Sequence, residues 1–154
     1  TVKRVIGPSL TAEERAAHEA REKQAAEVRA REAEEKRRDR ALLVRYPTRG
    51  MHDQERATAL AQIDAVINAS SKRTAELADQ RKAINAEFEF YVKYPSRAPT
   101  SLKRRLEENE SSVGVQKRFI ADQEQEKKRV NARFDEELAK LRELWALAAG
   151  TTKK

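Results

Sequence analysis

The sequence contains no cysteine, few aromatic residues (5%), and only four glycines and four prolines among its 154 residues. Without cysteine, the chain can form no disulfide, no thiolate metal site and no cysteine nucleophile. The low aromatic content leaves too little bulky apolar material for a globular core of this length. No run of 18 apolar residues occurs, so we expect no segment that spans a membrane.

Charged residues make up 38% of the chain, and with alanine and leucine they give the composition of long helices and coiled coils. The net charge of +7 does not lie along the expected helices, because residues 11–46 carry ten basic and nine acidic residues and residues 100–149 carry eleven and ten. Basic clusters such as Lys103-Arg104-Arg105 lie within a turn of glutamates, which favours ion pairs on a solvated surface. This pattern disfavours a nucleic-acid surface, which usually shows an unpaired basic stripe.

The first third of the chain predicts a highly charged helix over about 11–46. Thr11 is a good N-cap, followed by two glutamates in the first turn. Up to Arg40, Val28 is the only bulky apolar residue, so this helix has little to bury. Pro47 and Gly50 then interrupt the helical pattern. Whether this first helix projects or folds back as a third antiparallel helix is left open.

Two heptad-like seams follow, separated by a corner that Pro95 and Pro99 frame. A link this short predicts an antiparallel pair, with Ile67 opposite about Lys127 and Tyr91 opposite about 103–106. The second seam contains several polar residues, so self-association that hides part of it is a further prediction. The expected seam positions step by threes and fours: Leu60, Ile63, Ile67, Ser70, Thr74, Leu77, Arg81, Ile84, Phe88 and Tyr91, then Leu102, Leu106, Asn109, Val113, Gln116, Ile120, Gln123, Lys127, Val130, Phe134, Leu138, Leu141 and Trp145.

The predicted fold is all-α: an elongated antiparallel coiled-coil helical hairpin (about 52–94 and 100–148) with a third, highly charged N-terminal helix (about 11–46). We expect residues 1–10 to be a flexible lead-in, 11–149 to form a single extended helical unit, and 150–154 to be a flexible tail.

Apolar groups are expected at both ends of the hairpin. The corners share one pattern, Val44-Arg45-Tyr46-Pro47-Thr48-Arg49 and Val92-Lys93-Tyr94-Pro95-Ser96-Arg97. In each we expect tyrosine to seal a helix end and arginine to face water or a partner. The aromatic run 88–94, Phe90 included, is interpreted as hairpin-end core, with a stacking platform or partner pocket as the alternative. The candidate packing and interaction residues are Leu42, Leu43, Tyr46, Arg49, Phe88, Tyr91, Tyr94, Arg97, Leu141 and Trp145.

The sequence offers little catalytic chemistry. His18 lies among Ala and Glu on the polar first helix and His52 lies beside Asp53 at a corner, and neither has a second histidine at metal-ligand spacing. His52 is interpreted as a surface or helix-start residue in preference to a metal ligand. The serine pairs have no histidine placed by sequence to activate them. Glycines are too scattered for a phosphate loop; Gly114 marks either a close helix contact or a local weak point. We therefore predict a non-enzymatic protein without catalytic residues, cofactor or metal.

One resemblance rests on Arg38-Asp39-Arg40-Ala41-Leu42-Leu43, on Leu102-Lys103-Arg104-Arg105-Leu106-Glu107-Glu108-Asn109-Glu110 and on Arg133-Phe134-Asp135-Glu136-Glu137-Leu138. With the corner Arg45-Tyr46-Pro47, these runs resemble an uncharacterised family of proteobacterial coiled-coil proteins that are exported to the periplasm. The resemblance implies a cell-envelope setting and no known activity. The signal peptide and small N-terminal module typical of that family are not seen here.

Three functions remain. The first is a structural or adaptor protein of the bacterial cell envelope that bridges or braces protein partners. The second is a periplasmic holdase chaperone that grips unfolded clients between its arms. The third is nucleic-acid binding through the basic corners and tails, which would be sensitive to salt.

Overall fold

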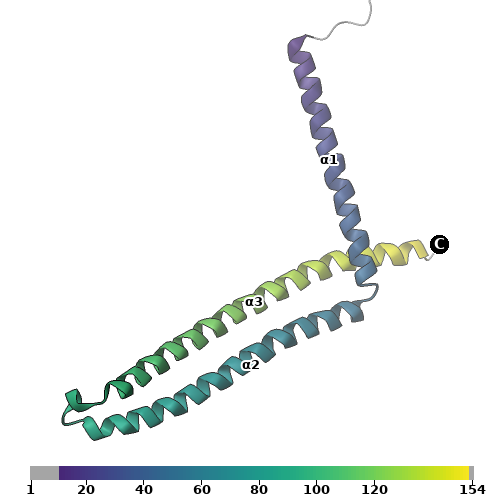
Figure 1. The fold of residues 1–154 in the computed structure, drawn as a ribbon. Coiled ribbons are helices and arrows are strands. Elements are labelled where there is room, and N and C mark those ends of the chain that lie inside the picture. Colours follow the sequence, from purple (N-terminus) through teal and green to yellow (C-terminus); the bar gives the residue numbers. More distant parts are fainter. Residues whose placement is uncertain (1–10, 153–154) are drawn as a thin grey trace, which may run out of the picture. The chain divides into compact units, whose positions relative to one another are not determined.

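The computed structural model describes residues 11–152, and within them the side chains of residues 11–150. The described residues form three long α-helices and two short 3₁₀ turns, and no β-strand occurs among them. The predicted all-α fold, a helical hairpin preceded by a third helix, is therefore confirmed (Figure 1). The expected lead-in at 1–10 and the last two residues of the expected tail lie outside the described range.

The chain divides into two compact units. One contains the first segment up to Pro47 together with the last segment from Lys140, and the other is Thr48–Ala139. The region predicted as one extended unit, 11–149, contributes to both.

Helix α1 is Ala12–Arg45 and begins where the capping pattern predicts. The Thr11 hydroxyl accepts a hydrogen bond from the backbone N–H of Glu14 at 3.0 Å, and Glu13 and Glu14 occupy the first turn. At the other end, the backbone N–H of Tyr46 donates to the Leu42 carbonyl at 2.9 Å. Because its sequence has almost no apolar face, α1 contains no buried residue.

Helix α2 is Arg49–Phe88, with Thr48 as its N-cap. The Thr48 hydroxyl accepts from the backbone N–H of Met51 at 3.3 Å. The helix ends six residues before the predicted position at Tyr94, because two 3₁₀ turns, η1 (Glu89–Tyr91) and η2 (Pro95–Arg97), complete the reversal.

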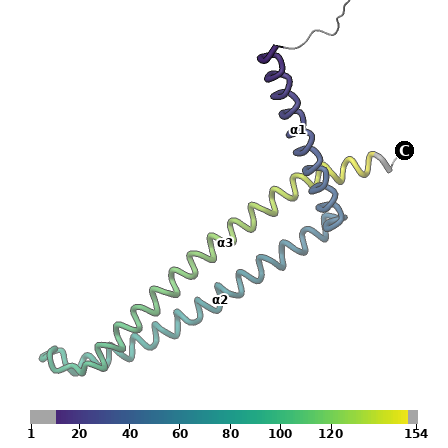
Figure 2. Tube along the Cα trace, turned by 45° about the horizontal axis from the view of Figure 1, so that its top comes forward, coloured from purple at the N-terminus to yellow at the C-terminus, as the bar shows by residue number. Residues whose placement is uncertain are grey.

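Helix α3 is Thr100–Thr152 and begins directly after Pro99. It continues through Thr152, so residues 150–152, which the sequence places in the tail, are helical. Figures 1 and 2 show α2 and the matching part of α3 side by side and antiparallel.

The predicted seam is confirmed position by position. Within α2, every seam residue from Leu60 onward is at least partly buried, and Ser70, Leu77 and Ile84 are fully buried. In the facing part of α3, Leu102, Asn109 and Phe134 are buried and the seam residues between them are partly buried. The three-and-four spacing therefore identifies the contact face of both arms.

The register differs from the prediction by about one helical turn. Lys127 was expected opposite Ile67, yet its ammonium contacts the Asp64 carboxylate at 2.7 Å. Tyr91 was expected opposite about 103–106, yet Arg105 pairs with Glu87 at 2.7 Å. The cause is the early end of α2, which moves the middle of the reversal from the centre of the Pro95–Pro99 link back toward Tyr94.

In the other unit, the end of α1 and the last part of α3 are joined by specific contacts. The Trp145 indole N–H donates to the Tyr46 carbonyl at 3.0 Å. The Lys140 ammonium lies 3.3 Å from the Glu35 carboxylate and 3.5 Å from that of Asp39. Leu141 and Tyr46 are fully buried.

Candidate interaction surfaces

Hydrogen bonds donated by side chains join the two arms of the hairpin along its length. The Ser70 hydroxyl donates to Oε1 of Gln116. The Asn109 amide donates to the Leu77 carbonyl at 2.9 Å and to Oε1 of Gln80 at 3.0 Å. Because each acceptor occupies one place on the opposite arm, these bonds fix the register of the pair.

The same kind of pairing continues toward the open end of the hairpin. The Arg56 guanidinium donates to Oδ1 of Asn131 at 3.0 Å and to the Asp135 carboxylate at 2.8 Å. Both partners lie on α3, one helical turn apart, so Arg56 bridges successive turns of the facing helix. This contact was not predicted, although continuing the seam from Leu60 toward the start of α2 reaches Arg56 after one turn.

His52 is the largest departure from the predicted site residues. It was interpreted as a surface or helix-start histidine, but its side chain is fully buried in the hairpin. Its Nε2 lies 3.2 Å from Oε1 of Glu137, and its ring stands edge-on to Phe134 with centroids 5.3 Å apart. One more step of four along the seam, from Arg56 to His52, places it on the contact face. The surface interpretation is wrong because the contact face of α2 extends beyond Leu60, through Arg56, to His52.

Two ion pairs across the hairpin shift the pKa of Glu87 and of Lys127. The Arg105 side chain, hydrogen-bonded to Glu87, lowers the pKa of that carboxyl below its usual range. The Asp64 carboxylate accepts a hydrogen bond from Lys127 and raises the pKa of that ammonium. Both shifts favour the charged form, the carboxylate of Glu87 and the ammonium of Lys127.

The tip of the hairpin, defined as residues 89–99, differs from the predicted hairpin-end core. Phe88 and Tyr91 are partly buried, as that interpretation requires. Phe90 is 86% exposed and Tyr94 is 59% exposed, so neither residue belongs to a hairpin-end core, and the interpretation is wrong for both. Phe90 falls between the seam positions 88 and 91, so on a helical path it is directed away from the face that Phe88 and Tyr91 share.

The two corners share a backbone conformation but not an environment. Tyr46 has φ −127° and ψ 73°, and Tyr94 has φ −137° and ψ 72°. Tyr46 is 2% exposed, whereas Tyr94 is 59% exposed. The prediction that tyrosine seals the helix end at both corners is therefore wrong for Tyr94. Arg97 stacks over the Tyr94 ring at 4.7 Å from its centroid.

The remaining candidate residues fall into two groups. Leu42 and Leu43 are partly buried, Leu141 is buried and Trp145 is partly buried, and the structure joins Trp145 to Tyr46 directly. Arg49 is exposed and lies 3.6 Å from the Asp53 carboxylate one turn further along α2. Val44, which follows Leu43 in the sequence, is exposed.

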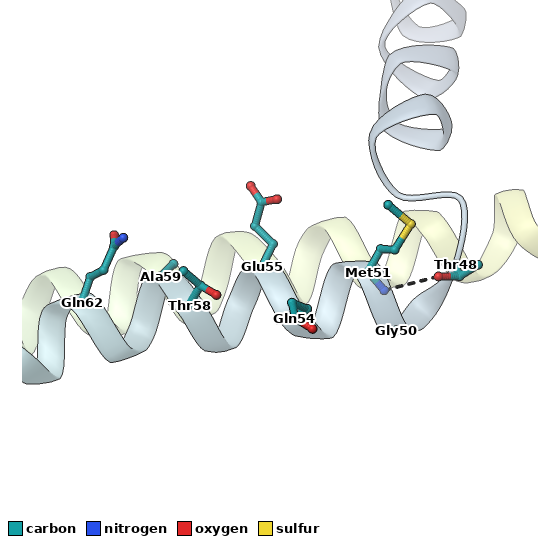
Figure 3. A pocket seen from close by; sticks show the side chains of 8 residues that line it. All are labelled: Thr48, Gly50, Met51, Gln54, Glu55, Thr58, Ala59 and Gln62. Carbon is teal, nitrogen blue, oxygen red and sulfur yellow. Dashed lines mark hydrogen bonds between the residues drawn. The ribbon is translucent and has the colours of Figure 1, made fainter.

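A shallow depression of about 740 Å³ lies along the start of α2. Figure 3 shows that its lining residues all come from one helical face and the cap before it, with the side chains of Met51, Glu55 and Gln62 directed to the same side. Glu55 is its one ionisable side chain. A surface with one wall and one carboxylate lacks the converging polar groups that orient a small-molecule substrate.

Within 11–152, no group of three or more His, Asp or Glu side chains is placed to hold a metal ion. In the same range, no helix combines the length and apolar character needed to cross a membrane.

Comparison with known proteins adds no relative: no protein-family model, no curated protein and no solved structure matches this chain.

Proposed function

We propose that the protein is a non-enzymatic adaptor of the bacterial cell envelope. In this proposal the α2–α3 hairpin acts as a spacer of fixed length, and the exposed helix α1 offers a surface to a protein partner. The envelope setting is supported by the resemblance to an exported coiled-coil family.

The observation that carries the proposal is the register-specific pairing of the two arms. Ser70 with Gln116, Asn109 with Leu77 and Arg56 with Asn131 connect α2 to α3 at successive positions. Two helices joined in this way resist sliding past one another, since a slip of one turn would leave buried polar groups without partners. With 40 residues in α2, the hairpin reaches about 60 Å at the helical rise per residue.

Helix α1 supplies the surface for a partner. It has 34 residues and no buried side chain, and charge pairs such as Arg37 with Glu34 stabilise its exposed face. Val28, which is exposed, lies among alanines and charged residues near the middle of the helix. Such a helix can pack a narrow small-residue face against another helix with little cost in desolvation.

Site-specific photo-cross-linking in the native cell tests this function. A photoreactive residue at Val28 of the full-length protein should capture the same one or few envelope proteins in every replicate. The matched control is the same residue at Val66, which is exposed on α2. Equal capture at both positions, or none at Val28, would contradict the proposal.

A holdase chaperone remains the second candidate, because the exposed Phe90 and Val92 could contact unfolded chains. It predicts a broad set of cross-linked clients and suppression of aggregation of a heat-unfolded reporter enzyme. An adaptor predicts neither result. A cross-linked product that nuclease digests would instead support the nucleic-acid alternative.

A further inference from the structure

The tip of the hairpin presents apolar side chains to solvent that the fold does not use. Phe90 is 86% exposed, Val92 70% and Tyr94 59%, all within five residues. Residues beside them, Phe88, Tyr91 and Leu102, fill the end of the seam. The end of the hairpin is therefore already packed, and the three exposed side chains are surplus to that packing.

The comparison between the two corners shows that this exposure is not imposed by the backbone. Tyr46 and Tyr94 adopt nearly the same φ and ψ angles. At the first corner the tyrosine is buried and its carbonyl accepts a hydrogen bond from Trp145. A corner with this sequence pattern can therefore bury its tyrosine, as at Tyr46, whereas the tyrosine of the tip, Tyr94, is exposed.

Positive charge surrounds the exposed apolar residues. Lys93 and Arg97 lie on the tip itself, and Lys103 and Arg104 follow within the first two turns of α3. All four are exposed, and none forms an ion pair with any part of the chain that the structure describes. Within the tip, Glu89 is the one carboxylate beside Lys93 and Arg97, and the nearby Glu87 is paired with Arg105. Lys103 and Arg104 have Glu107 and Glu108 one turn further along α3, away from the tip.

We infer that the tip of the hairpin docks on an anionic lipid bilayer. A protruding turn with aromatic and aliphatic side chains fits the headgroup region, where Tyr and Phe rings lie beside the polar groups and basic side chains contact lipid phosphates. A polyanion such as nucleic acid would contact the basic side chains, but it would make no favourable contact with the exposed apolar side chain of Val92. The tip closes the hairpin, so insertion of Phe90, Val92 and Tyr94 would leave both arms in water.

Binding of the full-length protein to lipid vesicles tests this inference. The absence of cysteine allows a single Val92→Cys variant to carry an environment-sensitive fluorophore, with Val66→Cys on the α2 arm as the matched control. Vesicles of phosphatidylcholine with phosphatidylglycerol should raise the emission of the probe at position 92 and leave that at 66 unchanged. Phosphatidylcholine alone should give a response weaker by about tenfold in apparent affinity.

Two double variants of the unlabelled protein separate the apolar and charged contributions in a vesicle co-sedimentation assay. Phe90→Ser with Val92→Ser, and Lys93→Glu with Arg97→Glu, should each weaken binding by about tenfold or more. The charge-matched control, Lys117→Glu with Lys128→Glu on the exposed face of α3, should weaken it by about twofold or less. Helical content by circular dichroism should be the same in all variants.

Three outcomes would overturn the inference. The first is no response to anionic vesicles at low salt. The second is binding that survives both tip variants. The third is a probe at position 92 that responds to polyglutamate or to a DNA duplex but not to vesicles, which would assign the tip to an acidic protein or a nucleic acid instead.

Discussion

The amide of Asn109 on α3 donates to the backbone carbonyl of Leu77 on α2 at 2.9 Å, and both residues are buried in the seam. Oδ1 of Asn109 has no hydrogen-bond partner among the described residues. A buried acceptor without a partner costs stability, so this asparagine favours one register at the expense of the free energy of unfolding.

Asn109→Leu should therefore raise the free energy of unfolding by about 1 kcal/mol, because an apolar side chain replaces a half-satisfied amide. Urea unfolding followed by circular dichroism measures it. Asn68→Leu, the same change at an exposed position of α2, is the control and should change stability little. The register between α2 and α3 should also become less specific. In a protein that carries Ser70→Cys and Gln116→Cys, adding Asn109→Leu should therefore slow formation of the disulfide between positions 70 and 116. A loss of stability in Asn109→Leu would contradict the argument.

His52→Ala should lower the free energy of unfolding by about 2 kcal/mol. The change removes a buried ring packed against Phe134 and leaves Glu137 without the group 3.2 Å from its Oε1. The control is His18→Ala, since the His18 side chain is more than half exposed and should tolerate the change. Equal effects of the two substitutions in chemical denaturation would show that the His52 contacts do not stabilise the hairpin.

Glu87 should contribute to the loss of stability in acid. Its pKa is lowered in the folded protein from the ordinary value of 4.5 by the hydrogen bond from Arg105. The contribution is thus present above the ordinary pKa and is lost as the pH falls through the lower, folded value. Urea midpoints of the wild type and Glu87→Gln should differ at neutral pH and converge as the pH falls below 4.5.

A second variant checks the cause of that shift. Arg105→Gln should move the Glu87 titration, followed by carboxyl carbon NMR, back toward the ordinary value. A Glu87 midpoint that stays low in this variant would assign the shift to another group.

Gly114→Ala should raise the free energy of unfolding by about 0.5 to 1 kcal/mol, because glycine weakens a helix interior relative to alanine. An added Cβ would lie 3.3 Å from Nη1 of Arg118, the flexible end of a side chain on the same helix. The glycine therefore does not mark a close approach of the two arms. Gly150→Ala, where nothing lies within 4 Å, is the control for the propensity effect alone. Destabilisation by Gly114→Ala would mean that Arg118 cannot move aside.

Seam position was predictable because the spacing of Leu60, Ile63 and Ile67 already encodes one face of a helix. The caps at Thr11 and Thr48 are equally local, since a hydroxyl needs only the N–H three residues ahead. Both signals depend on neighbours in sequence, and both agree with the structure.

The register and the environment of Tyr94 depend instead on the path of the reversal. Proline marks where a helix cannot continue, but it does not fix how many residues the 3₁₀ turns before it use. That count decides whether Lys127 meets Ile67 or Asp64. Nothing in the local pattern of Val92-Lys93-Tyr94-Pro95 distinguishes it from Val44-Arg45-Tyr46-Pro47, although one tyrosine is buried and the other exposed.

Trp145 is the only tryptophan of the chain, and it belongs to the unit that contains α1, not to the Thr48–Ala139 hairpin. Its indole N–H donates to Tyr46, so its emission spectrum reports on that unit's integrity. Far-ultraviolet ellipticity, by contrast, averages over all three helices. Melting curves recorded with the two probes therefore show, without any mutation, whether the units unfold as one cooperative block or in succession.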